Sequence, residues 1–315
     1  MTPKVSVLLP VYNAGPFLRE AVESILRQSF EDFEFIIIDD GSTDGSAEFL
    51  DSVSDPRIRL IHQANQGLRA TLNTGLQQSV GTYIARMDHD DVSLPQRLAR
   101  QVAFLDTHPD HVLVGTTYAY IDDQNRVLGV FPALLEDSDI KLELLTKSPF
   151  GHGTVMFRAS ALRAGHFQYA LDAVHVEDYD LWIRFASAGK YANLPDVLYL
   201  WRRSATNTTN EHGRMQQTRT RTLRAAALRA TYSADLLRCP KWNALHKYRN
   251  DQVEILGEQI IVQRRGAHAS LYLVLASLLA NQHHFFDASR ALVLAFIISP
   301  AYVLRAGFRH SFKNS

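Results

Sequence analysis

The first hundred residues alternate between short apolar runs and amphipathic segments, and this alternation constrains the fold more than any other feature. Residues 5–13 (VSVLLPVYN), 33–40 (FEFIIIDD) and 81–88 (GTYIARMD) read as buried strands, whereas residues 14–28 and 67–80 carry apolar side chains at helical spacing. Strands that alternate with helices form a parallel sheet covered on both faces. We therefore predict an α/β fold for this part of the chain.

The pattern changes in the second hundred residues. Residues 112–122 and 127–131 predict two strands that can pair, and residues 176–189 predict an amphipathic helix that opens on acids. The last third of the chain has helical apolar spacing throughout. We predict an α/β domain over residues 1–212 and a helical region over residues 213–315.

Charge is divided unevenly along the chain. Residues 1–200 carry 16 Lys and Arg against 27 Asp and Glu, and residues 201–315 carry 17 against 6, so the formal net charge of zero conceals a basic C-terminal part. A basic part suggests an anionic partner, either the acidic N-terminal domain or a membrane face. The chain has no zinc-finger spacing and no recognisable nucleic-acid-binding motif, which argues against a nucleic-acid partner.

The single cysteine, Cys239, excludes a disulfide framework and suits a reducing compartment. The N-terminus opens on a strand pattern without the basic start and cleavage site of a signal peptide. The longest charge-free apolar run, residues 291–304, contains Pro300 and is too short to span a bilayer. We expect a cytoplasmic protein whose basic helices can contact the inner membrane face peripherally.

Polar side chains follow the strands where they end. Asn13 follows the first strand, Asp39 and Asp40 end the second, and residues 88–91 (DHDD) follow a later one. Ligands of parallel sheets bind beyond the carboxyl ends of the strands, so we expect these side chains to converge. Clustered carboxylates suit Mg²⁺ or Mn²⁺, which would neutralise a diphosphate. The alternative is structural, with Asp91 capping the next helix and the other acids solvated.

Asp39 and Asp40 have two interpretations. Either carboxylate can accept hydrogen bonds from a nucleotide base or a ribose, and Asp40 can also form an Asx turn with Gly41. The sequence leaves both open.

The helix over residues 176–189 begins with three acids, Glu177, Asp178 and Asp180. One acid could cap the helix, and a second, facing the polar side chains at the strand ends, could be a general base. His152, between two glycines, could approach a phosphate or metal, although a lone histidine is more often structural. Arg202 and Arg203 could reach a pyrophosphate or be solvated.

Six segments, taken together, resemble glycosyltransferase family 2, the inverting transferases of GT-A fold. They are SVLLPVYN, IIIDDGSTDGS, NQGLRATLN, GTYIARMDHDDVSLPQRLARQ, HGTVMFR and VEDYDLWIRF, in family order and at family spacing over roughly residues 4–205. The resemblance implies a GT-A fold, that is, a Rossmann-like, mixed and mostly parallel sheet with flanking helices. It does not cover the helical region.

The resemblance also implies roles for single residues. The nucleotide-sugar site would contain Pro10, Tyr12, Asn13, Asp39 or Asp40, Arg69, Asp88, His152 and Arg202. Asp90 would hold the metal bound to the donor diphosphate, with Asp91 beside it, and Asp178 would be the catalytic base. His89 and Arg69 stand where the family has smaller residues; Arg69 could narrow the pocket or touch a phosphate.

The implied activity is transfer of a sugar from a nucleoside-diphosphate sugar, with UDP favoured, to a hydroxyl of a glycan or lipid-linked acceptor. The cofactor would be Mn²⁺ or Mg²⁺, and the helical region could contact membrane, acceptor or a second copy of the chain. One alternative is a non-catalytic scaffold. Another is a sugar nucleotidyltransferase, but such enzymes usually have a glycine- and basic-rich phosphate loop near the N-terminus, which the segment VYNAGPFLR of this chain matches poorly. The absence of G-x-G-x-x-G after the first strand argues against a dehydrogenase.

Overall fold

The computed structural model describes residues 2–144 and 147–203, and all the elements in this part of the chain belong to one compact unit. Its strands are β1 (Val5–Val11), β2 (Phe33–Asp39), β3 (Ile58–His62), β4 (Tyr83–Arg86), β5 (Val92–Ser93), β6 (His111–Ile121), β7 (Val127–Phe131), β8 (Met156–Arg158) and β9 (Lys190–Arg202). Its helices are α1 (Leu18–Leu26), α2 (Ser46–Ser52), α3 (Leu68–Gln78), α4 (Arg97–Thr107), α5 (Asp137–Leu144), α6 (Ala159–Ala164) and α7 (Glu177–Phe185), with 3-10 turns η1 (Gly15–Phe17) and η2 (His152–Thr154). The predicted boundary at residue 212 and the predicted helical region lie outside the described residues.

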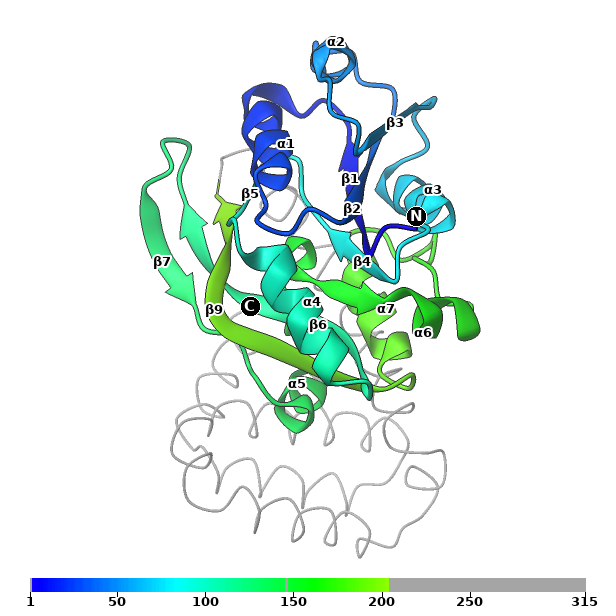
Figure 1. Cartoon of the computed structure of the whole chain (residues 1–315), viewed down its shortest axis with the longest axis vertical. Helices are drawn as coiled ribbons and strands as arrows, with labels where there is room; N and C mark the ends of the chain where they lie inside the picture. Colours follow the sequence, from blue (N-terminus) through cyan, green and yellow to red (C-terminus); the bar gives the residue numbers. More distant parts are fainter. Residues whose placement is uncertain (1, 145–146, 204–315) are drawn as a thin grey trace, which may run out of the picture. The chain divides into compact units, whose positions relative to one another are not determined.

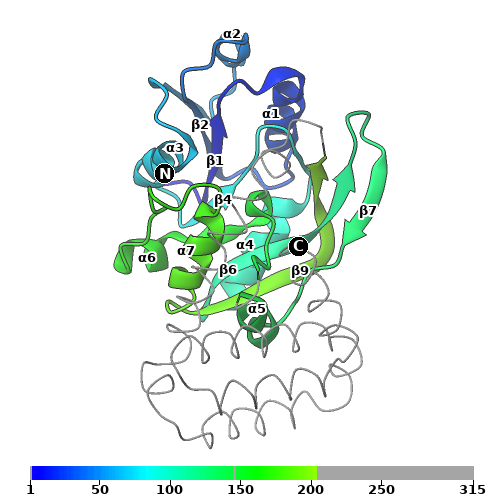
Figure 2. The same cartoon turned by 180° about the vertical axis from the view of Figure 1, so that it is seen from behind.

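The described strands form one mixed sheet in the order β3-β2-β1-β4-β8-β6-β9-β5, with β7 paired to β6. Strands β3, β2, β1 and β4 are mutually parallel, as the alternation predicts. Strand β8 runs antiparallel to both β4 and β6, and β9 runs parallel to β6. The predicted mixed sheet with flanking helices is confirmed (Figures 1 and 2). Its parallel half carries the polar motifs at the carboxyl ends of its strands.

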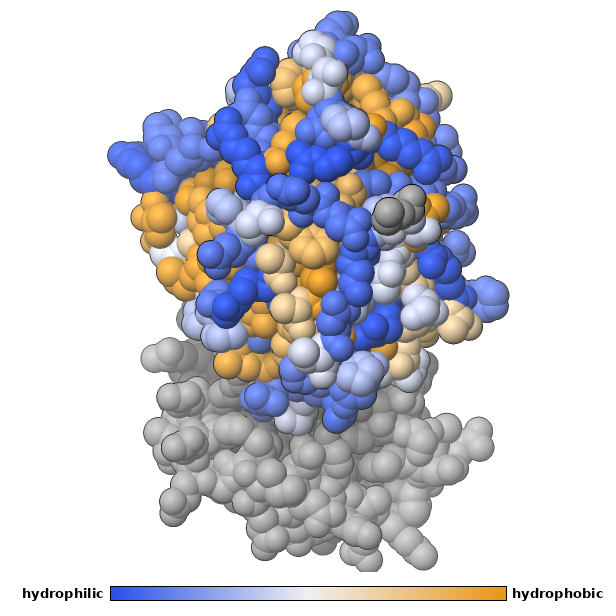
Figure 3. Space-filling model, viewed as in Figure 1, coloured by the Kyte–Doolittle hydropathy of each residue, from blue (hydrophilic) through white to orange (hydrophobic). Residues whose placement is uncertain are grey.

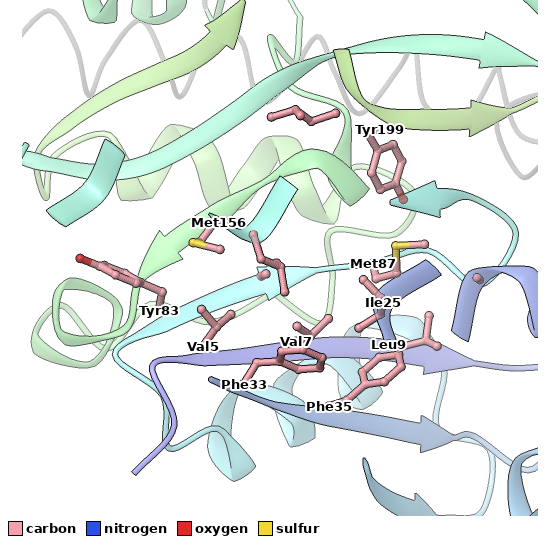
Figure 4. Close-up of a cluster of buried hydrophobic side chains, with 14 of the residues drawn as sticks. Val5, Val7, Leu9, Ile25, Phe33, Phe35, Tyr83, Met87, Met156 and Tyr199 are labelled. Atoms are coloured by element: carbon pink, nitrogen blue, oxygen red, sulfur yellow. The ribbon is translucent and has the colours of Figure 1, made fainter. Parts of the chain in front are cut away.

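Both faces of this parallel half are covered. Successive side chains of a strand point to opposite faces, so Val5, Val7 and Leu9 of β1 share one core, which also contains residues of α1 and α4 (Figure 4). Burying each such side chain contributes about 1.5–3 kcal/mol. On the other face Leu8 meets α3 at Gly75, where an added Cβ would lie 3.2 Å from the leucine. Glycine thus lets α3 approach closely, and the strand ends remain for a ligand.

The antiparallel part of the sheet ends in an apolar edge. Val127, Leu128 and Val130 of β7 are more than half exposed, and Figure 3 shows hydrophobic atoms along this edge at the left. The inner side of the β6–β7 hairpin is packed, with Phe131 stacked on Tyr118 at 5.0 Å between ring centroids. No helix among the described residues is long and apolar enough to cross a membrane.

Candidate active site

The loops that follow β1 and β2 are braced against each other. The N–H of Asn13 donates to the Ser42 hydroxyl at 3.0 Å, and the Asn13 side-chain oxygen accepts from the N–H of Thr43 at 2.8 Å. Asn13 has a φ of 47°, a left-handed conformation that asparagine tolerates better than most residues. This backbone presents Tyr12, which is 49% exposed, beyond the strand end, while Pro10 is buried inside β1.

Asp39 is buried at the end of β2, and both of its oxygens are engaged. One oxygen accepts from the N–H of Ser42 at 3.0 Å, and the other lies 2.9 Å from Nδ1 of His62. Burial alone would raise the pKa of Asp39, but the hydrogen bonds from Ser42 and His62 outweigh burial and hold the pKa below its ordinary value. Asp39 is therefore a fixed anion at the strand edge.

Asp40 shapes the start of α3. Its carboxylate accepts from the Gln63 amide at 2.7 Å and from the backbone N–H groups of Gln66 and Gly67 at 2.9 and 2.8 Å. The predicted Asx turn at Asp40 is wrong, because the turn N–H of Ser42 goes to Asp39 instead. Asp40 thus holds the loop between β3 and α3.

Strand β4 ends in a buried cation that faces the acidic motif. Arg86 is 3% exposed, and its guanidinium forms an ion pair with Asp88. Burial would raise the pKa of Asp88, but Arg86 outweighs burial and lowers it. Nε of Arg86 has no hydrogen-bond partner among the described residues. The first acid of the motif is therefore already paired within the protein.

The pKa values of Asp90 and Asp91 are shifted in the opposite direction to that of Asp88. Burial and then the charge of Asp88 raise the pKa of both carboxyls, and for Asp91 the rise is large. Asp91 accepts the N–H of Arg202 at 2.7 Å. The predicted alternative in which Asp91 caps the next helix is wrong, because α4 begins only at Arg97 and has no side-chain cap. No other side chain in the described residues donates a hydrogen bond to the Asp90 carboxylate.

Arg202 supports the acidic loop from beneath. The side chain is 1% exposed, and its guanidinium donates to Glu20 at 2.6 Å and to the backbone oxygens of Asp90 and Asp122 at 2.8 and 2.9 Å. It also lies over the ring of Phe17, 4.2 Å from the centroid. The predicted solvation of Arg202 is wrong, because the side chain is buried. The predicted contact with a pyrophosphate would require Arg202 to leave these partners.

The turn η2 places His152 near the acidic loop. Nε2 of His152 lies 2.9 Å from the hydroxyl of Tyr169. Burial, followed by the charge of Arg86, lowers the pKa of His152 well below its ordinary value, so the ring is neutral. A Cβ added at Gly153 would lie 2.8 Å from an oxygen of Asp88, so only glycine permits this close approach. His152 and the acidic loop therefore share one site.

Asp178 is the second residue of α7, and the charge of Arg86 on β4 reaches its carboxyl. Burial and the neighbouring charge of Glu177 raise the pKa of Asp178 to about 7, although Arg86 acts in the opposite direction. The predicted capping role for an acid here is wrong, because the N-cap residue is Val176 and no side chain caps the helix. A carboxyl that titrates near neutrality suits a general base.

Arg69 lies on α3, and its charge acts on Glu177 of α7. Burial raises the pKa of Glu177, and the charges of Arg86 and Arg69 oppose this rise. Nε of Arg69 is buried without a hydrogen-bond partner in the described part of the chain. Arg86 of β4, Arg69 of α3, Asp88 of the acidic loop and the two acids Glu177 and Asp178 of α7 thus form one electrostatic group.

The residues of this site fit a divalent cation that is held mainly by a substrate. In the described residues no three His, Cys, Asp or Glu side chains gather to enclose a metal. Within the acidic loop, Asp90 offers a carboxylate that is raised in pKa and accepts no hydrogen bond from another side chain. Magnesium is commonly bound by one or two carboxylates together with substrate phosphates, and this donor set matches that pattern.

The fold and these acidic strand ends define the class of the protein as a GT-A glycosyltransferase. The S. aureus TarS structure (residues 1–349, with UDP-GlcNAc) superposes with a TM-score of 0.59 and 17% identity, over 96% of this chain and 92% of that one. The mannosyltransferase PcManGT of Pyrobaculum calidifontis, solved with GDP-Man and Mn²⁺, gives a TM-score of 0.53 at 20% identity, over 98% and 80%. At such identities the likeness shows the fold alone.

The sequence model of glycosyl transferase family 2 matches residues 6–165. A Bacillus subtilis protein named as a glycosyltransferase, EpsE, is 42% identical over 205 residues, which cover 62% of this chain and 72% of EpsE. The amylovoran biosynthesis glycosyltransferase AmsE of Erwinia amylovora is 34% identical over 204 residues, 61% of this chain and 74% of AmsE. The chain belongs to glycosyl transferase family 2.

Sequence reasoning does not identify three residues of this site. Arg86 carries a signal, because it is a cation inside the otherwise apolar run YIARM and directly precedes the acids. His62 and Tyr169 carry none, since their partners Asp39 and His152 lie 23 and 17 residues away. Only the fold brings these pairs together.

Proposed function

We propose that the protein is an inverting, metal-dependent glycosyltransferase. It moves a sugar from a nucleoside-diphosphate sugar, with UDP favoured, to a hydroxyl of a glycan or lipid-linked acceptor in polysaccharide biosynthesis. AmsE is named for amylovoran biosynthesis, which supports the polysaccharide part, and the UDP-GlcNAc complex of TarS supports the donor class. The GDP-Man complex of PcManGT makes GDP the next candidate.

The strand order supports the way the donor would lie. Neighbouring strands are about 4.8 Å apart, so β2 and β4, which flank β1, separate Asp39 from the acidic loop by roughly 10 Å. In this proposal Tyr12 and Asp39 meet the base at one end, Asp88 lies near the ribose, and Asp90 faces the diphosphate at the other end. A divalent cation bound at Asp90 would neutralise the charge that develops on the departing diphosphate.

Asp178 is the proposed base. Its carboxylate removes the proton of the acceptor hydroxyl while the acceptor oxygen forms a bond to the anomeric carbon. The bond to the diphosphate oxygen breaks, and its electron pair leaves with the nucleoside diphosphate. Because attack and departure occur on opposite faces of the sugar, one displacement inverts the anomeric configuration.

One observation carries this proposal most strongly. The single guanidinium of Arg86 pairs with Asp88 and also acts on the titration of Asp178, so the acidic loop and the proposed base lie within one electrostatic site. Those two motifs are about ninety residues apart in the sequence, and a degenerate scaffold has no need to keep their charges together.

Calorimetric titration tests the proposal first. UDP, GDP and dTDP would each be titrated into the whole chain with and without Mn²⁺, followed by the sugar nucleotides of whichever base binds. We expect one nucleotide to bind in a metal-dependent way, and NMR of the transferred sugar to show an inverted anomeric centre. If no nucleotide binds under either condition, the scaffold interpretation is correct instead. Retention of configuration would overturn the single displacement.

A further inference from the structure

His62, the last residue of β3, lies between two carboxylates that come from different elements. Its Nδ1 is 2.9 Å from an oxygen of Asp39, and its Nε2 is 3.1 Å from an oxygen of Asp51. Asp39 ends the neighbouring strand β2 in register with His62, and Asp51 belongs to α2. Figure 1 shows α2 and β3 together at the top of the molecule. The histidine therefore ties β2 to α2.

This arrangement selects one protonation state of the ring. An ionised carboxylate can only accept hydrogen bonds, so both contacts are satisfied only when both ring nitrogens carry a hydrogen. A neutral imidazole has one N–H and must leave one carboxylate without a donor. Asp39 from β2 and Asp51 from α2 are the charged groups that act on His62, and the hydrogen bond to Asp39 is the largest cause of its raised pKa.

The consequence reaches the loops beyond the strand ends. The second oxygen of Asp39 accepts from the N–H of Ser42, and the Ser42 hydroxyl accepts from the N–H of Asn13. The Asp39 side chain is only 5% exposed, so its carboxylate has little room to rotate. The proton on His62 thus helps to fix the carboxylate and, through it, the loop pair that follows β1 and β2.

We propose that His62 is a positioning residue for the donor nucleotide: in its doubly protonated form it bridges Asp39 and Asp51 and so holds the Asp39 carboxylate ready for the nucleotide base. The inference rests on the proposed function. It implies that nucleotide affinity falls as pH rises and His62 loses a proton. Removing the charge of Asp51 should move this fall to lower pH, because one of the two carboxylates that favour imidazolium is gone.

The test is UDP affinity as a function of pH, measured by calorimetry with Mg²⁺ present. Wild type, His62→Gln and Asp51→Asn would be compared between about pH 6 and about pH 8.5, the range in which histidine titrates. We expect the wild-type Kd to rise about fivefold more than that of His62→Gln across this range, a coupling of ordinary size. Titration of the UDP phosphate is common to all variants and cancels in the comparison. Asp51→Asn, whose residue is 66% exposed at the side chain, should show the same rise at lower pH.

A matched control is His111→Gln, since His111 also contacts an aspartate, Asp110, at 2.8 Å but stands at the start of β6. Its pH dependence should equal that of wild type. Nitrogen-15 NMR of the imidazole rings reads the protonation of His62 directly and should show two N–H groups at the acidic end of this pH range. If UDP binds with the same pH dependence in wild type and His62→Gln, the positioning role is wrong. If UDP binds to neither, the proposed function itself fails.

Discussion

The acids at the end of β2 and those around β4 and α7 are all at least partly buried, yet the pKa values of Asp39 and of Asp90 and Asp178 are shifted in opposite directions. Asp39 receives hydrogen bonds from Ser42 and His62 that outweigh burial and lower its pKa. For Asp90 and Asp178, burial and neighbouring acids win, and both pKa values are raised. The donors, more than the depth of burial, set the difference.

The two groups of acids serve different purposes at the same edge of the sheet. Where backbone N–H groups and His62 satisfy the carboxylates, the acids stabilise the folded chain without any ligand. Where acids face one another, the fold holds them at a cost in stability, and a cation and substrate would relieve that cost. This contrast is typical of a site in which one side recognises a ligand and the other does chemistry.

The largest expected effect is at Asp178, which belongs to the acids whose pKa values are raised. Asp178→Asn should lower kcat by roughly a thousandfold, because general-base catalysis contributes about 10²–10⁴-fold. UDP affinity should stay within twofold, roughly, since the amide keeps the shape of the side chain. The matched control is Asp180→Asn on the same helix, whose carboxylate instead pairs with Arg184 at 2.6 Å. An Asp178→Asn enzyme with near-normal turnover would assign the base elsewhere.

For the acids whose carboxylates accept hydrogen bonds, a substitution should lower the free energy of unfolding. Asp40→Ala leaves the N–H groups of Gln66 and Gly67 without their acceptor. A buried donor left unsatisfied costs about 1–3 kcal/mol. Because both hydrogen bonds are only partly buried, urea unfolding should show a loss of about 1–2 kcal/mol. The exposed Asp123→Ala, on the hairpin between β6 and β7, should change stability by less than about 0.5 kcal/mol. Equal losses in both variants would remove the contrast between the two groups of acids.

Asp90→Asn sharpens the comparison, because it should separate binding from stability. We expect metal-dependent UDP affinity to fall by at least about 10–100-fold, because loss of a residue that only supports a metal ligand already costs that much. The metal-free protein should be no less stable at neutral pH, since burial and Asp88 already disfavour the charge of Asp90. Calorimetry and urea unfolding on the same samples measure the two effects. A marked loss of stability would show that Asp90 is structural.

The smallest expected effect is a displaced pH profile. Asp178 must be ionised to act as base, so kcat/KM should rise with pH through a midpoint near 7. Glu177→Gln removes the charge that raises this pKa after burial, and the rising limb should move to lower pH by less than about one unit. Stability runs the other way: because the folded pKa of Asp178 exceeds the ordinary 3.8, its contribution is present in acid and is lost as pH rises toward 7. An unmoved limb would exclude Asp178 as the group that titrates.

Much of this could be predicted from the sequence, because strand and helix periodicity is local. The strands before Asn13, Asp39 and Asp88 and the helix at Asp178 were all predicted near their observed positions. What could not be predicted are pairings across long separations. Asp91 was offered as a helix cap, but its N–H donor is Arg202, 111 residues away. Such long-range pairs decide which carboxylates accept hydrogen bonds and which carboxyls have a raised pKa.

The braced loops after β1 and β2 have a kinetic consequence. Since Asn13, Ser42 and Thr43 are already bonded to one another, a nucleotide arriving at this edge meets an assembled surface and need not wait for the loops to order. Association should then be fast and similar for different nucleotides. Discrimination among UDP, GDP and dTDP would reside in how long each stays bound.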